Sequence, residues 1–116
     1  MIPEKMYERV CTILGKNVSQ QQFIGFYNDG VYELMSMYKG DILFGENEQY
    51  IPVETVYDCS GLKTEFSLPL LFNILYSFTG NKSYKADFLA EAENIYHLLW
   101  HKTSTGRRMG AKRKEK

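Results

Sequence analysis

The chain has few cysteines, few prolines and no long apolar stretch. It contains two cysteines, three prolines and one tryptophan in 116 residues. Cys11 and Cys59 follow no recognisable spacing pattern, which favours two half-buried free thiols in a reducing cytoplasm over a disulfide scaffold. No segment approaches the ~18 consecutive apolar residues of a membrane helix, and residues 1–5 do not resemble a signal peptide. These absences predict a protein that folds in the cytoplasm and is not inserted in a membrane.

Motifs for catalysis and cofactor binding are also missing. The sequence has no glycine-rich dinucleotide or phosphate loop and no nucleophile elbow. His97 and His101 are four residues apart on one predicted helix, but no general base lies between them and no further metal ligand is positioned beside them. Glu91 and Glu93 are two residues apart and therefore point away from each other. The sequence predicts no catalytic residue, no metal ligand and no cofactor, so the protein is not expected to be an enzyme.

The charge is distributed unevenly although it sums to zero. Residues 102–116 carry seven basic side chains and one acidic one, whereas residues 1–101 carry seven basic and thirteen acidic side chains. The body therefore has a net charge of −6 and the C-terminal segment a net charge of +6. A cationic segment of this kind binds a negative partner: nucleic acid, a membrane surface, or an acidic face of another protein, including a second copy. The predicted partner-binding residues are Arg107, Arg108, Lys112, Arg113 and Lys114.

This C-terminal segment is predicted to be an extended arm. Gly106 and Gly110 disfavour a helix. No aromatic residue follows Trp100, so the side chains that stack on single-stranded bases are missing. A solvated terminus that only improves solubility is an alternative interpretation of the same composition.

Apolar residues at helical spacing predict a mainly α fold with four helices. The hydrophobic content of 44% is sufficient for one folded domain of this length. The first helix is predicted over residues 4–14, with Gly15 as its stop. The second begins at Ser19, which forms a capping box with Gln22, and ends at Gly40.

The second half of the domain is predicted to be a helical hairpin. Ser67 is expected to cap a helix that runs to Thr79, and a short turn leads to the longest helix, over residues 83–101. The inward-facing residues of that last helix are predicted to be Phe88, Ala92, Ile95, Leu98 and Leu99. Between the two halves, residues 41–66 are β-prone and are predicted to form an extended segment or a loose β-hairpin. The predicted division is therefore a helical domain, residues 1–101, and a basic arm, residues 102–116.

Three residues of the second helix need a structural explanation. Gly25 and Gly30 each cost up to about 1 kcal/mol in a helix interior, so each predicts the close approach of another helix or chain. Asn28 lies between apolar neighbours, where its amide needs buried partners. It is expected to bond a backbone group of the extended segment.

The order of these parts resembles the head–tail connector proteins, or adaptors, of tailed bacteriophages. The resemblance covers roughly residues 4–101. It is carried by the aromatic second helix around Asn28 (residues 23–35), the proline-containing stretch 50–56, and the helical hairpin that opens at 68–70 and continues through 88–95. The basic arm and the brevity of residues 41–66 depart from the family pattern.

The resemblance implies a structural role in the virion. Adaptors of this family are mostly helical, assemble as a dodecameric ring beneath the portal, and extend the DNA channel toward the tail. They have no catalytic residues. The implied partners are the portal protein, a tail or second connector protein, other copies of the chain, and DNA that passes without sequence-specific contacts. Such a protein is made in the cytoplasm of the host bacterium and resides at the head–tail interface of the virion.

Two other functions remain open. The first is a small phage or bacterial nucleic-acid-binding or inhibitor protein whose basic arm contacts phosphates, which predicts an affinity that falls steeply with salt. The second is a helical interaction module with another partner.

Overall fold

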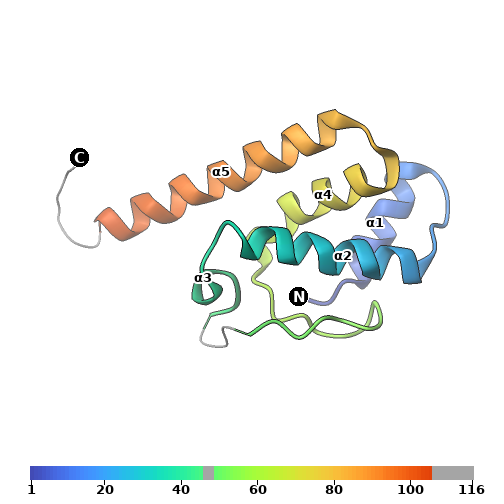
Figure 1. Cartoon of the computed structure of the whole chain (residues 1–116), viewed down its shortest axis with the longest axis horizontal. Coiled ribbons are helices and arrows are strands. Elements are labelled where there is room, and N and C mark those ends of the chain that lie inside the picture. Colours follow the sequence, from blue (N-terminus) through green and yellow to red (C-terminus); the bar gives the residue numbers. More distant parts are fainter. Residues whose placement is uncertain (46–48, 106–116) are drawn as a thin grey trace.

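The structure is a computed structural model that describes residues 1–45 and 49–105, with the side chains of the last helix described as far as Leu98. Within these residues the chain forms five α-helices and one 3-10 turn, and no β-strand (Figure 1). The elements are α1 (Glu4–Leu14), α2 (Gln20–Met35), α3 (Gly40–Phe44), η1 (Thr64–Phe66), α4 (Ser67–Thr79) and α5 (Lys82–Thr105). The predicted mainly α fold is confirmed, but the described residues contain five helices where four were predicted.

Local capping signals predicted several helix ends correctly. Gly15 follows α1 and Gly80 follows α4, both with the left-handed backbone that glycine adopts without strain. Ser19 caps α2, because its Oγ accepts a hydrogen bond from the Gln22 N–H at 3.2 Å. The prediction for Ser67 was wrong. Phe66 occupies the cap position and Ser67 is the first helical residue, since η1 runs directly into α4.

The region after α2 differs most from the prediction. α2 ends at Met35, and the Oγ of Ser36 turns back to donate to the Glu33 carbonyl at 2.6 Å. Gly40 therefore begins α3 instead of ending α2. The β-prone stretch that follows Gly40 forms a helix because this turn places Leu43 and Phe44 in the core. The remainder of the predicted extended segment, residues 49–63, contains no strand.

α4 lies at the centre of the fold and contacts α1, α2 and α5 (Figure 1). Its buried residues are therefore spread over more than one side of the helix. They are Pro69, Leu70, Leu71, Asn73, Ile74 and Leu75. The surrounding helices contribute the other large part of the core, which comprises Met6, Val10, Phe23, Tyr27, Val31, Leu34, Leu43, Phe88 and Ala92. The connection from α4 to α5 is two residues long, which makes the two helices antiparallel neighbours.

The two glycines of α2 have different roles. A Cβ built on Gly30 would lie 2.5 Å from Cδ1 of the fully buried Leu70 and 3.3 Å from Nδ2 of Asn73. Gly30 therefore permits the close approach of α2 to α4, as predicted. A Cβ on Gly25 would meet no atom within 4 Å, so the predicted close approach at Gly25 is absent from the described residues.

This difference gives a matched pair of variants. Gly25→Ala should stabilise the protein by up to about 1 kcal/mol, because alanine favours the helix and meets no neighbour. Gly30→Ala should destabilise the protein by about 1–2 kcal/mol, because the free-energy cost of overpacking against Leu70 is larger than the gain in helix propensity. Denaturant unfolding of both variants checks this. Equal effects of the two substitutions would contradict the close contact between α2 and α4.

Candidate functional site

The predicted partner-binding residues Arg107, Arg108, Lys112, Arg113 and Lys114 lie outside the described residues. The structure does describe the backbone of the helix that leads to them. α5 runs through the predicted domain boundary at residues 101 and 102 and ends at Thr105. The candidate interaction surfaces of the described residues are the end of α5, the loop at residues 50–58, and a pocket beside α1.

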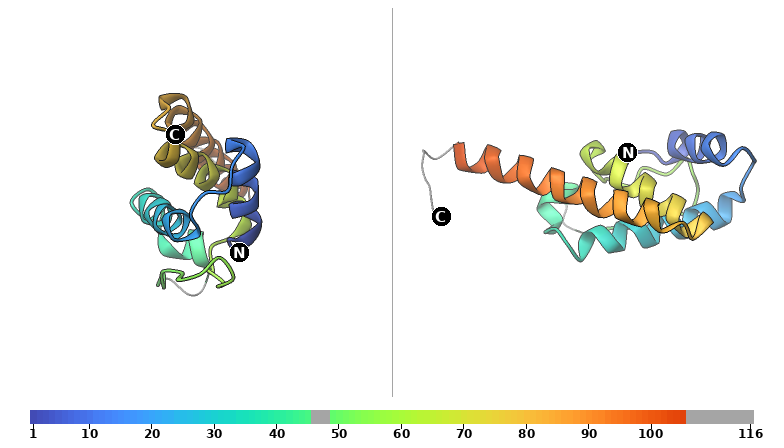
Figure 2. Two further views of the ribbon diagram at one scale, coloured as in Figure 1. Left: turned by 90° about the vertical axis from the view of Figure 1, so that its right-hand side faces the viewer. Right: turned by 90° about the horizontal axis from the view of Figure 1, so that it is seen from above.

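The C-terminal part of α5 projects from the body as a single helix (Figure 1 and Figure 2). α4 has 13 residues and α5 has 24, so at ~1.5 Å per residue α5 is about 16 Å longer. Phe88 and Ala92 are buried and Ile95 is half-buried, as predicted. Leu98, however, is 65% exposed and Tyr96 is 55% exposed. The predicted inward position of Leu98 was wrong because Leu98 lies about 120° around the helix from the buried Ala92. The side chain of Leu99 lies outside those described.

The part of α5 before this projection is held firmly on the body. The hydroxyl of Tyr38, which follows α2, donates to the Ala92 carbonyl. The ammonium of Lys85 lies 3.8 Å from the Glu33 carboxylate and 4.8 Å from the centre of the Phe88 ring. These contacts fix the direction in which the projecting end leaves the body.

The start of the 50–58 loop is fixed to α2 by a polar cluster. The cluster is made of Asn28 from α2 and of Tyr50 and Val53 from the loop. Nδ2 of Asn28 donates to the Val53 carbonyl at 3.0 Å, and its Oδ1 accepts from the Val53 N–H at 3.1 Å. The hydroxyl of Tyr50 donates to the same Oδ1 at 2.5 Å. Burial raises the pKa of Tyr50, which keeps its hydroxyl protonated as a donor. The predicted bond from Asn28 to the backbone of this segment is confirmed.

The tip of the loop is ordered by Asp58. Its carboxylate accepts from the backbone N–H of Glu54 at 2.8 Å and of Thr55 at 3.0 Å. These bonds, that to Glu54 first, lower the pKa of Asp58, so the carboxylate stays charged. Ile51 is 75% exposed and Tyr57 is 63% exposed. The loop therefore presents apolar and acidic side chains on a well-held backbone.

Beyond the tip, Ser60 joins the loop to the N-terminus and to α2. Its N–H and its Oγ both bond to the Met1 carbonyl, at 2.9 and 3.0 Å. The hydroxyl of Tyr27 donates to Ser60 Oγ at 2.9 Å, and burial raises the pKa of Tyr27 to about 12. Residues 50–60 are thus attached to the core at both ends.

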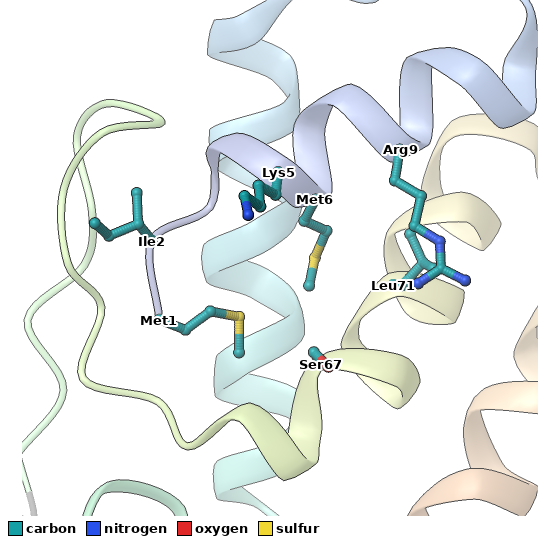
Figure 3. A pocket seen from close by; sticks show the side chains of 7 residues that line it. All are labelled: Met1, Ile2, Lys5, Met6, Arg9, Ser67 and Leu71. Atoms are coloured by element: carbon teal, nitrogen blue, oxygen red, sulfur yellow. The ribbon is translucent and has the colours of Figure 1, made fainter.

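A pocket of about 240 Å³ lies between the N-terminus, α1 and the start of α4 (Figure 3). Its lining is mainly apolar, with Lys5 and Arg9 one helical turn apart on α1. The lining residues are Met1, Ile2, Lys5, Met6, Arg9, Ser67 and Leu71. Within the described residues no ion pair is formed by Lys5 or Arg9. The sequence alone did not indicate this pocket, because it forms between the N-terminal residues and the start of α4, which are far apart in the chain.

The other chemically active residues lie on the surface or apart from one another. Nε2 of His97 is 3.5 Å from the Glu93 carboxylate on the exposed side of α5. Among the described residues no group of three or more His, Cys, Asp or Glu side chains is arranged to hold a metal ion. Cys11 is half-buried as predicted, but Cys59, which directly follows the 50–58 loop, is exposed. The backbone N–H of Gly61, with the nearby N-terminal ammonium, lowers the pKa of Cys59.

Comparison with known proteins adds no relative from which function can be transferred. No family model, curated protein or solved structure matches the chain. In the described part of the chain, no helix combines the length and apolar character that crossing a membrane requires. The surfaces themselves are therefore the basis on which a function is proposed.

The Asn28 cluster can be tested by substitution. Asn28→Ala leaves both backbone groups of Val53 without their partner and should cost about 2 kcal/mol of unfolding free energy, whereas Tyr50→Phe removes one bond and should cost about 1 kcal/mol. Hydrogen exchange at the Val53 amide should accelerate in the Asn28 variant. Asn17→Ala, at an exposed site between α1 and α2, serves as the control. A Val53 amide that exchanges at the wild-type rate would contradict this role of Asn28.

Proposed function

We propose that this protein is a head–tail connector, or adaptor, of a tailed bacteriophage. It forms a ring under the portal and extends the DNA channel. The end of α5 and the basic arm after it dock on the portal or on a neighbouring subunit. The observation that supports this most is the projection of the end of α5 from the body (Figure 1), together with the exposure of Leu98 near that end.

The projecting end has the composition of a protein-binding segment. Tyr96 and Leu98 are 55% and 65% exposed, and Leu98 is an aliphatic side chain that the body leaves uncovered. Seven basic side chains follow in residues 102–116. A partner with an apolar groove rimmed by acidic residues would satisfy both features, because it buries the apolar side chains and pairs the cations.

The acidic body suits a channel through which DNA moves. Residues 1–101 have a net charge of −6, and several copies around a ring would repel the DNA phosphates. A wall of this sign does not hold DNA tightly. DNA would therefore pass without sequence-specific contacts, as the proposed role requires.

The net charge of +6 on residues 102–116 also supports a second candidate, a small protein that binds nucleic acid through its arm. This candidate predicts a binding constant for duplex DNA that falls steeply as salt increases, with a slope set by the number of cations engaged. A flat salt response would exclude it.

The adaptor proposal predicts separate effects of the arm and of the apolar helix end. Deletion of residues 103–116 should weaken binding to the portal protein of the same genome, because the cations are lost. Leu98→Asp should weaken it by about tenfold or more, because a charge replaces a buried contact. Leu98→Asp should unfold at the wild-type temperature, since Leu98 is 65% exposed. Light scattering of the chain alone and with portal measures the assembled mass.

Leu89→Asp is the matched control for the helix end. Leu89 is 49% exposed on the part of α5 that lies along the body, so its substitution should leave portal binding unchanged. Wild-type portal binding by both the truncated chain and Leu98→Asp would overturn the docking role of this end.

A further inference from the structure

We propose that the pocket beside α1 receives the 50–58 loop of a second copy of this chain, with Ile51 as the side chain that enters it. The contact involves neither the end of α5 nor the basic arm. It adds a contact between copies to the ring of the proposed function, and it can be tested without a portal protein.

The size of the pocket selects the kind of ligand. Sites for small molecules and cofactors typically measure about 300–1,000 Å³, and this pocket holds about 240 Å³. That volume suits one large apolar side chain. Met6 and Leu71 are buried at its base, so an entering aliphatic group would meet apolar atoms there.

The charges at the pocket select what lies beside that side chain. Lys5 and Arg9 line it, whereas Glu4 and Glu8, the acidic residues of α1, do not. Both cations are exposed and form no ion pair within the described residues. A segment that presents an apolar side chain next to carboxylates is therefore complementary to the pocket.

The chain itself carries such a segment. Ile51 has the largest exposed fraction of the large apolar side chains described, 75%. Glu54 and Asp58 are the charged residues of the loop, and both are acidic. In a docked pair, Ile51 would fill the pocket and these carboxylates would approach Lys5 and Arg9 of the other copy.

The 50–58 loop is also preorganised for binding. Asn28 holds its start, Asp58 orders its tip, and Ser60 joins its end to Met1. A segment already fixed in shape loses little conformational entropy when it binds. This explains why three groups of polar contacts hold an irregular loop that leaves Ile51 and Tyr57 exposed.

The test uses two single variants of the full chain and their mixture. Arg9→Glu disables the pocket but keeps the loop, and Ile51→Asn disables the loop but keeps the pocket. Each variant alone should associate with itself at least about tenfold more weakly than the wild type. An equimolar mixture should regain association, because one intact pocket meets one intact loop. Sedimentation velocity over a concentration series measures all three.

The controls change the same chemistry elsewhere. Lys16→Glu reverses an exposed charge after α1, and Leu89→Asn alters an exposed leucine of α5. Both should associate like the wild type. Circular dichroism should give wild-type melting for every variant, since each site is exposed.

Three results would overturn the proposal. One is a wild-type chain that stays monomeric throughout the series. Another is self-association that Arg9→Glu and Ile51→Asn leave unchanged, and a third is a mixture that associates no better than either variant. If the wild type is monomeric and Arg9→Glu instead abolishes binding to the portal, the pocket belongs to that partner and not to a second copy.

Discussion

Burial of α4 on several sides is the constraint on which the rest of the structure depends. A helix with apolar residues around most of its surface is stable only when other helices cover it. α1, α2 and α5 each supply an apolar face, and Gly30 lets α2 come close enough to complete the contact. The two-residue connection after α4 makes α5 antiparallel to it. Because α5 is longer than α4, its end necessarily leaves the body.

The irregular loop follows from the same arrangement. Backbone groups outside helices and strands still need hydrogen-bond partners when they lie against a core. α2 faces the core with Tyr27 and Phe23 and meets the loop with the polar ends of Tyr27 and Asn28. One helix therefore supplies both apolar burial and the bonds that shape the loop. The fold thereby obtains a well-held surface outside its secondary structure.

The correct sequence predictions share a local origin. Gly15, Ser19 and Gly80 act within one turn of their own helix ends, so their neighbours in sequence are sufficient to assign them. Asn28 was also predictable, since an amide among apolar helix residues requires a partner and the adjoining segment has free backbone groups. The short α3 was not, because a three-residue apolar run after a glycine fits a strand as well as a helical turn.

The sequence by itself determined the helical class, the positions of the long helices, the opposite charges of body and arm, and the need of Asn28 for a partner. Only the tertiary structure decided which apolar residues remain uncovered. Helical spacing places Leu98 at the margin of the face formed by Ala92 and Ile95, about 120° from Ala92, and whether that margin is buried depends on where the neighbouring helix begins. The pocket likewise exists only where α1 meets the start of α4, residues that lie far apart along the chain. Periodicity reports the chemistry of a face, and packing alone determines what covers it.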